Sequence, residues 1–208
     1  MGRRSDVIQW YDPLVEPTRS QLRCPWCEGD EIYTAYHDKE WGKPLKNNQK
    51  LFELLTLEGA QAGLSWITIL KRREGYREAF DGFDAEKIAR YTEKDVKRLM
   101  ADARIIRNRR KITSTIENAR LYLEMMEAGR SFSKWLWNFV DGTPIVNHWR
   151  TMKEVPVTTE LAERISKELK QRGFSFVGPT IIYSYMQSAG LVNDHLISCF
   201  RHPDNMSG

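Results

Sequence analysis

The chain has 208 residues, of which 41% are hydrophobic and 29% are charged, and its formal net charge at pH 7 is +4. This composition is typical of a soluble globular protein, and the mild positive charge permits an anionic partner without requiring one. The sequence contains neither an apolar run of membrane-spanning length nor the apolar core of a signal peptide. We therefore expect a cytoplasmic monomer that has no membrane partner.

The first half of the chain predicts a series of helices. Residues 1–22 carry prolines and scattered charges without periodicity, so we expect a loosely packed N-terminal extension before a folded domain at 23–202. Apolar residues at helical spacing predict a helix over 49–63 and a second one that begins near Ser65. Short amphipathic segments follow, and then a helix with an acidic first turn after Thr92.

The second half is also helical in pattern. Five cations fall within residues 104–111 and lead into a long helix over 112–127. Such a run is usually a solvated helix face, and contact with DNA is the alternative. Further helices are expected within 131–150 and from Thr158 to about residue 171, while residues 203–208 form a tail. Because no strand pattern of useful length is visible, we expect an all-α fold.

The stretch from Arg172 to Cys199 predicts the end of one helix, a tight hairpin at 173–178, a second helix and a His-x-x-x-Cys pair. Gly173 and Gly178 permit backbone angles that other residues resist. Several amides can then point outward together and, with the N-terminus of the next helix, bind a phosphate oxygen. The alternative is an ordinary helical turn with a C-cap glycine, and this stretch alone does not decide between them.

Three cysteines, an odd number in a reducing compartment, argue against a disulfide framework and favour metal binding or reactivity. They fall, with two histidines, in two short windows near the ends of the folded part. Zinc prefers a tetrahedral set of such ligands, and His195 and Cys199 share one face if they are helical. Two sets are open: Cys24, Cys27, His195 and Cys199, or Cys24, His37, His195 and Cys199. Either set would hold a structural ion that joins the two chain ends.

Aromatic residues gather around the proposed ligands. Trp26, Tyr33 and Tyr36 lie in the first window, and residues 57–66 bring the carboxylate of Glu58 and the indole of Trp66 to a helix–turn–helix junction. A carboxylate surrounded by aromatic faces can bind a flat, positively charged heterocycle by stacking and hydrogen bonding. The alternative is that the aromatic residues form the core and Glu58 is exposed, and composition alone favours it.

Several long blocks together carry a resemblance to a known family. They cover about residues 22–200 in one order: RCPW, YTAYHDKEWG, LFELLTLEGAQAGLSWITILKRR, RGFSFVGPTIIYSYMQSAGLVNDH and the final Cys199. The sequence resembles the 3-methyladenine DNA glycosylase I family, the constitutive alkylation-repair glycosylases of bacteria. The resemblance implies an all-helical member of the helix-hairpin-helix glycosylase superfamily, with two lobes and double-stranded DNA bound across the cleft.

The resemblance also implies a ligand set for the metal. It places one structural zinc ion on Cys24, His37, His195 and Cys199, and so decides between the two sets. Cys27 lies where the family does not require a ligand, so exchange between Cys27 and His37 is a further expectation to test.

The same resemblance implies roles around the DNA. Glu58 would contact the base as the catalytic-site carboxylate, Trp66 and Tyr36 would stack around it, and Tyr33 and Trp26 would help form the pocket. The turn Gly63-Leu64 would fill the gap left by the flipped nucleotide. The hairpin from Gly173 to Gly178 would anchor the DNA backbone.

The implied reaction needs little acid catalysis. N3-methyladenine is cationic in DNA, so its glycosidic bond is already weak, and the enzyme must flip the base out, recognise it and let water attack the sugar. Free 3-methyladenine and an abasic site are the expected products. Relatives in the superfamily place an aspartate after the hairpin, but the family is thought to manage without one, so we assign Asp194 no catalytic role. The alternative function is a zinc-stapled module that binds DNA lesions without cleaving.

Overall fold

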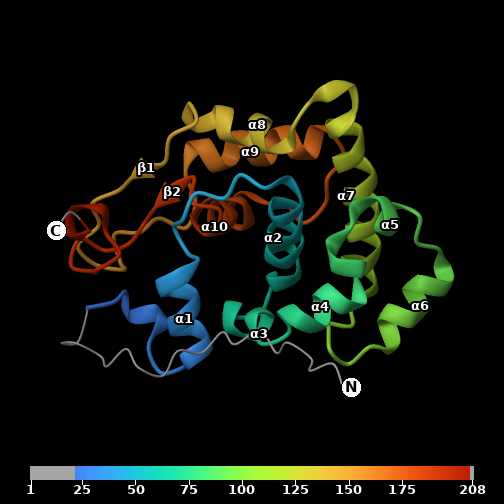
Figure 1. The fold of residues 1–208 in the computed structure, drawn as a ribbon, viewed down its shortest axis with the longest axis horizontal. Coiled ribbons are helices and arrows are strands. Elements are labelled where there is room, and N and C mark those ends of the chain that lie inside the picture. Colours follow the sequence, from blue (N-terminus) through green and yellow to red (C-terminus); the bar gives the residue numbers. More distant parts are fainter. Residues whose placement is uncertain (1–21, 207–208) are drawn as a thin grey trace, which may run out of the picture.

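The computed structural model describes residues 22–206 (Figure 1). The extension expected at residues 1–22 therefore lies, apart from Leu22, outside the described residues. Within 22–206 the chain is mostly helical, as expected. The α-helices are α1 (Glu31–Lys39), α2 (Asn48–Gln61), α3 (Trp66–Leu70), α4 (Arg73–Ala79), α5 (Ala85–Ala89), α6 (Glu93–Ala101), α7 (Arg109–Met126), α8 (Phe132–Trp137), α9 (Glu160–Gln171) and α10 (Pro179–Ser188).

Short elements connect these helices. Single 3-10 turns are η1 (Pro25–Cys27), η2 (Asp81–Phe83), η3 (Glu127–Gly129), η4 (Asn138–Val140) and η5 (Pro203–Asn205). Two strands of two residues each, β1 (Ile145–Val146) and β2 (Val192–Asn193), pair in parallel. A two-residue strand is too short to produce a readable alternation, which is why the sequence pattern showed no strand. Within residues 22–206, every helix is too short or too polar to cross a lipid bilayer.

Polar caps fix where several helices begin. The Asn47 side chain accepts a hydrogen bond from the Lys50 amide at the start of α2. Thr92 and Asp95 form a capping box at the start of α6. Each cap satisfies an amide that has no partner inside its helix. The expected helix starts near residue 49 and after Thr92 are confirmed.

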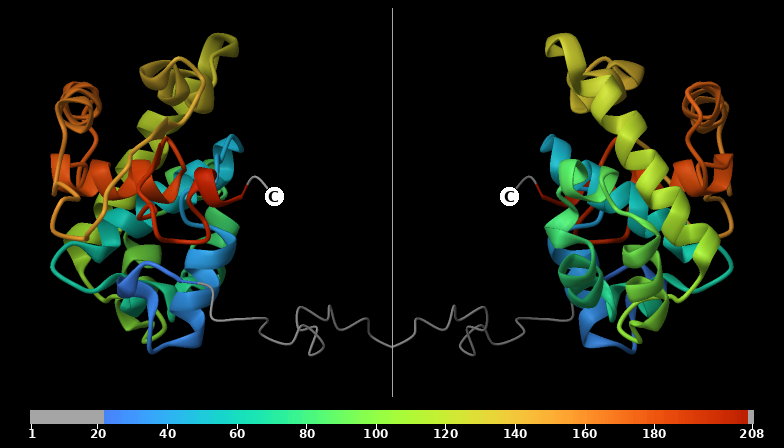
Figure 2. Two further views of the ribbon diagram at one scale, coloured as in Figure 1. Left: turned by 90° about the vertical axis from the view of Figure 1, so that its left-hand side faces the viewer. Right: turned by 90° about the vertical axis from the view of Figure 1, so that its right-hand side faces the viewer.

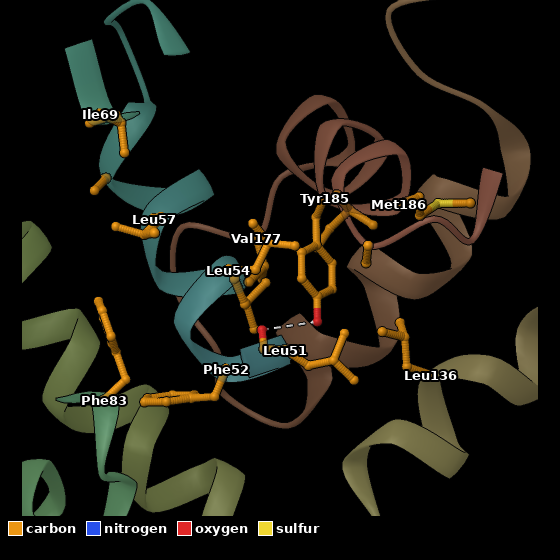
Figure 3. Packing of buried hydrophobic residues seen from close by; sticks show 14 of the residues in the cluster. Leu51, Phe52, Leu54, Leu57, Ile69, Phe83, Leu136, Val177, Tyr185 and Met186 are labelled. Atoms are coloured by element: carbon orange, nitrogen blue, oxygen red, sulfur yellow. Dashed lines mark hydrogen bonds between the residues drawn. The ribbon is translucent and has the colours of Figure 1, made fainter. Parts of the chain in front are cut away.

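The core is centred on α2, which is buried along most of its length. Leu51, Phe52 and Leu57 of this helix are fully buried, and Tyr185 of α10 lies beside Leu51 and Leu54 (Figure 3). The Tyr185 hydroxyl donates a hydrogen bond of 3.1 Å to the carbonyl of Leu51. This packing fixes α10 beside α2, so that polar residues at the C-terminal ends of both helices can meet. In all views α1 lies at the opposite end of the molecule from α8 and α9 (Figures 1 and 2).

Two features of the C-terminal region differ from expectation. A helix was expected at His195 and Cys199, but both residues lie in an irregular segment that contains a turn. The reason is that α10 ends at Ser188 and β2 lies between α10 and these residues. Residues 203–205 form η5 and not a free tail. The Asn205 side-chain amide donates to the carbonyls of Ile197 and Cys199 at 2.9 and 2.8 Å, and so holds η5 against this turn.

Candidate active site and metal centre

The five residues predicted for the base pocket line one cavity of about 210 Å³: Trp26, Tyr33, Tyr36, Glu58 and Trp66. They come from η1, α1, α2 and the first residue of α3. The cavity is also lined by Met152 and Val155, which belong to the irregular segment between β1 and α9. The structure therefore brings together residues that are spread over most of the chain.

Aromatic rings form two walls of this cavity. Trp26 packs on Tyr33 with ring centroids 4.8 Å apart, and Tyr36 packs on Trp66 at 5.6 Å with an interplanar angle of 55°. A base sandwiched between two rings needs centroids about 7 Å apart, twice the ordinary stacking separation. A flat base can therefore lie against the Tyr36–Trp66 pair in this structure, but not between the two rings.

Glu58 is buried, with 2% of its surface exposed, so the alternative that it is an exposed residue is wrong. The Ser188 hydroxyl donates to its carboxyl oxygen Oε1 at 2.6 Å, and the Tyr36 hydroxyl donates to Ser188 at 2.9 Å. Burial raises the pKa of Glu58 to about 8, although the hydrogen bond from Ser188 opposes this shift. The carboxyl is therefore largely neutral at pH 7, and a cationic ligand would favour its ionised form.

Sequence reasoning missed the polar residues of α10 that line the same cavity. Ser184, Gln187 and Ser188 are three and four residues apart and share one face of the helix. A polar stripe on an otherwise apolar, buried helix is the signal that can identify them. In addition, the Trp66 indole N–H is buried and has no acceptor within the described residues. A ligand acceptor in the cavity would satisfy this donor.

Asp194 lines the cavity too, but protein donors occupy its carboxylate. Asn147 and Trp149 donate to its Oδ1 at 2.6 and 2.8 Å, while Tyr183 and Gln187 donate to its Oδ2 at 2.5 and 2.8 Å. A carboxylate offers about four acceptor sites, so this one has none left for a catalytic water. Asp194 instead ties the segment after β1 to α10.

Replacing Asp194 with Asn should destabilise the fold by about 2–4 kcal/mol, because an amide group would face two donors and leave them unpaired in a buried site. Urea unfolding measures the change. The matched control is Asp141→Asn, since Asp141 is exposed and has a positive φ of 51° that Asn tolerates. Equal stability of the two variants would contradict the structural role of Asp194.

The predicted zinc ligands Cys24, His37, His195 and Cys199 converge, and their ligand atoms all lie within 4.8 Å of one another. Cys199 Sγ is 3.4 Å from His37 Nε2 and 3.5 Å from His195 Nδ1, and Cys24 Sγ is 3.7 Å from His195 Nδ1. Tetrahedral zinc with ordinary bond lengths separates sulfur and nitrogen ligands by roughly 3.5 Å. The four residues fit such an ion.

The outer contacts of the two histidines fit metal binding as well. His37 directs its second nitrogen to Asp38 at 2.7 Å, and His195 directs its own to the Trp41 carbonyl at 3.2 Å. Metal-bound histidines usually have such an oxygen partner, which fixes the tautomer and the ring orientation. Cys27 lies outside the group: its thiol donates to the Cys24 carbonyl at 3.1 Å, and burial raises its pKa to about 11.

The hairpin differs in part from its predicted backbone. Gly173 has a φ of 96°, a backbone conformation that favours glycine, as expected. Gly178, in contrast, has an ordinary φ of −63°. The left-handed residue near the end of the hairpin is Phe176, with a φ of 57°. A Cβ added at Gly178 would meet no atom within 4 Å, so the fold itself does not require glycine there.

Only part of the hairpin presents free amides. The Phe174 amide donates to the Leu169 carbonyl, and the buried Asn118 side chain both accepts from the Ser175 amide and donates to its carbonyl at 2.9 Å. Sequence reasoning missed Asn118, which clamps the hairpin to α7. Within residues 22–206, the amides of 176–178, Thr180 and Ile181 have no protein acceptor, so they can bind an anion.

Three of the five cations at 104–111 are engaged by the protein itself. Arg104 pairs with Asp102 at 2.8 Å and with Glu78, and Arg109 pairs with Glu93 at 2.6 Å. The cluster is therefore only in part a solvated face, and only some of its cations are available to an anionic partner. Arg110 is exposed and lines a hollow of about 780 Å³ against the hairpin, so it is the best placed of the five to meet an anion there.

Lys111 supports the turn that follows α2. Its ammonium donates to the carbonyls of Ala60 and Ala62 at 2.8 and 2.7 Å, which caps the C-terminal end of the helix. Gly63 has a φ of 80°, and the apolar side chain of Leu64 is 41% exposed. A second cavity of about 310 Å³ reaches from this turn to Glu58, which also lines the aromatic cavity.

Comparison with known proteins identifies the family of this chain. A family model described as methyladenine glycosylase matches residues 26–202. The chain is 52% identical over 183 residues to DNA-3-methyladenine glycosylase 1 of Escherichia coli (strain K12), which covers 88% of this chain and 98% of that protein. It is also 52% identical to a DNA-3-methyladenine glycosylase of Haemophilus influenzae, covering 85% of this chain and 96% of that protein.

Solved structures show the same fold. A crystal structure of 3-methyladenine DNA glycosylase I superposes with a TM-score of 0.86 at 50% identity, over 88% of this chain and 100% of the other. A structure of 3-methyladenine DNA glycosylase I from Staphylococcus aureus, solved to explain recognition of 3-methyladenine, superposes with a TM-score of 0.84 at 41% identity, over 87% and 96% of the two chains. The resemblance seen in the sequence is thereby confirmed, and the chain belongs to the methyladenine glycosylase family.

Proposed function

We propose that this protein is a DNA repair glycosylase that flips N3-methyladenine out of double-stranded DNA and hydrolyses its N-glycosidic bond. The products are free 3-methyladenine and an abasic site. The observation that carries the proposal is the buried carboxyl of Glu58 in an aromatic cavity, which opens beside the exposed Leu64. The relatives named for DNA-3-methyladenine glycosylase activity support the same reaction.

Charge recognition follows from the pKa of Glu58. Because burial raises this pKa to about 8, the carboxyl is mostly protonated at neutral pH, and a positive charge that enters the cavity favours loss of the proton. A methylated adenine supplies that charge and also offers an amino donor at its edge. Guanine offers a carbonyl acceptor at the corresponding place, which a carboxylate repels. Glu58 therefore selects cationic adenine over 7-methylguanine.

The bond cleavage needs no acid catalyst among the side chains. The base leaves as a neutral molecule from a cationic nucleoside, so no acid has to protonate it. Asp194 has its acceptor sites filled by four donors and does not activate water. The cavity contributes by holding the flipped base against Tyr36 and Trp66, and Leu64 enters the space that the base leaves in the duplex.

The DNA backbone binds to the helix-hairpin-helix unit formed by α9, residues 172–178 and α10. The free amides at 176–178 and the positive end of the α10 dipole hold a phosphate. The glycosylase domain spans residues 23–202 and consists of two helical lobes around a DNA-binding cleft. It acts as a monomer. Zinc, bound by the two cysteines and two histidines of the metal centre, plays a structural part and joins the two ends of the domain.

Gly178 provides a separate test of DNA binding. Its Cβ position is open and its backbone angles are ordinary, so Gly178→Ala and Gly178→Val should fold with wild-type stability. Both should weaken binding to a duplex with an abasic site, about tenfold for Ala and more for Val, because a side chain keeps phosphate away from the amides. Fluorescence anisotropy measures the affinity. Unchanged binding by the folded Val variant would remove the hairpin from the interface.

Strand-cleavage chemistry separates this function from its alternatives. A methylated duplex is incubated with the protein, and half of each sample is then heated with alkali. The proposed glycosylase gives strand breaks only after alkali, because it leaves an intact abasic site. Breaks without alkali would indicate a lyase. No more breaks after alkali than in methylated DNA treated without protein would indicate a module that binds lesions without cleaving.

A further inference from the structure

A second group of metal-ligand side chains lies apart from the cysteine-containing centre. His148, His202 and Asp204 place one ligand atom each within 4.8 Å of the others. The carboxylate of Asp204 is 3.5 Å from His148 Nε2 and 3.6 Å from His202 Nδ1. His148 follows β1 closely, and Asp204 belongs to η5, so the group joins two segments beside the C-terminal end of the described chain (Figure 1).

The orientation of the His202 ring is the informative feature. This side chain is fully buried, and its Nε2 lies 3.1 Å from the Asn147 carbonyl, which can only accept. Nε2 therefore carries the proton, and the lone pair of Nδ1 lies on the side of Asp204, whose amide donates to it at 3.3 Å. His37 and His195 show the same arrangement in the first centre, where one nitrogen meets an oxygen and the other faces the ligand group.

The spacing fits a borderline divalent cation. Bonds of about 2.0–2.2 Å in a tetrahedral arrangement separate nitrogen and oxygen ligands by roughly 3.4 Å. Nδ1 of His202 otherwise accepts only a long hydrogen bond of 3.3 Å from the Asp204 amide, which an ion would replace. His148 and Asp204 are 61% and 65% exposed, so solvent can supply the remaining ligands.

We propose that His148, His202 and Asp204 form a second metal site, which binds zinc or a similar divalent ion through two imidazoles and one carboxylate, with water completing the shell. Imidazole nitrogens favour zinc over magnesium, which prefers oxygen ligands. The site has open positions and no thiolate, so it binds more weakly and exchanges faster than the first centre.

Such an ion would anchor the segment that contributes Met152 and Val155 to the cavity lining. Asn147 holds His202 through its carbonyl and donates to Asp194 through its side chain, and Trp149 donates to the same carboxylate. Met152, a few residues later, lines the cavity. Binding at the second site therefore ties this segment to η5 as well as to Asp194.

The test uses protein that already holds zinc in the first centre. After dialysis, Zn²⁺ is titrated by calorimetry, and the histidine C2 protons are followed by NMR. The wild type should take up one further equivalent, and two of the four histidines of the chain should shift. His148→Ala and Asp204→Asn should each weaken this binding at least tenfold, whereas Arg150→Ala, an exposed change on the same segment, should not.

Three results would overturn the proposal. The first is that the wild type takes up no further Zn²⁺. The second is that both His148→Ala and Asp204→Asn bind the further Zn²⁺ as tightly as the wild type. The third is that Mg²⁺ binds as tightly as Zn²⁺. Because both altered side chains are exposed, circular dichroism should show folded variants, and a loss of binding can then be assigned to the missing ligand.

Discussion

Replacing Glu58 with Gln should make the ligand-free protein more stable at pH 9, although it removes the residue that we place at the base. Burial raises the pKa of Glu58 to about 8, whereas a carboxyl of an unfolded chain ionises near pH 4.3. Between these values the folded state keeps a proton that the unfolded state has lost. The free energy of unfolding of the wild type therefore falls as the pH rises, by at most about 1.4 kcal/mol per pH unit.

Gln cannot ionise and can still accept the hydrogen bond from Ser188, so it escapes this loss. We expect Glu58→Gln to be more stable than the wild type by about 5 kcal/mol at pH 9 and by about 1 kcal/mol at pH 5. Urea unfolding at both pH values measures the difference. Glu124→Gln, at an exposed position on α7, is the control and should change stability equally at the two pH values. A Glu58→Gln variant that is less stable at pH 9 would contradict the buried, proton-holding carboxyl.

Ionisation of Glu58 should also make the affinity for a cationic ligand rise with pH, whereas the stability of the ligand-free protein falls. A permanently cationic probe, 3,9-dimethyladeninium, binds best when Glu58 is ionised, so its affinity should rise with pH up to about 8, by as much as tenfold per unit. Binding at pH 6.5 should release a proton, which calorimetry detects in buffers of different ionisation enthalpy. Glu58→Gln should bind more weakly at every pH and release no proton. Proton release by the Gln variant would show that another group senses the cation.

Replacing Cys199 with Ser should remove zinc and lower stability together. The Cys199 sulfur is fully buried and lies 3.4 Å from His37 Nε2 and 3.5 Å from His195 Nδ1. Its loss leaves a zinc ion with three protein ligands and no thiolate at the fourth position. We expect less than a tenth of the wild-type zinc content and a loss of more than about 3 kcal/mol of unfolding free energy. Elemental analysis and urea unfolding give the two numbers.

Cys27→Ser is the matched control for this change, because Cys27 is a buried thiol nearby that bonds the Cys24 carbonyl and not the ligand group. It should keep its zinc. If both serine variants lost the metal equally, the ligand set would include Cys27 and the centre would be misassigned.

The sequence predicted most of the helices because apolar spacing and capping residues depend only on residues close together in the chain. The cap at Asn47 and the capping box at Thr92 each depend on residues within one turn. The His195–Cys199 pair is not helical, although its spacing is compatible with both a helix and a turn; α10 ends at Ser188 and β2 lies between this helix and the pair. Neighbouring residues in the sequence do not contain that information.

Long-range partners are what the sequence could not reveal. Ser188 relays a hydrogen bond from Tyr36 to Glu58, and Asn118 holds the hairpin, through contacts that depend on how distant helices pack. The polar stripe on α10 marked Ser188 as unusual, but its partner could be found only from the packing of α10 on α2. Asn118 has no comparable signal, because a single polar residue on a long helix is usually solvated.

Chromatography of the bases released from methylated duplex DNA tests the proposed function most directly. The DNA carries both N3-methyladenine and 7-methylguanine, and the wild type and Glu58→Gln are compared at equal concentration. We predict that the wild type releases 3-methyladenine in preference to 7-methylguanine, and that Glu58→Gln releases 3-methyladenine at least tenfold more slowly. Release of no base by the wild type, or release of both bases at the same rate by both proteins, would contradict the role of the buried carboxyl in this cavity.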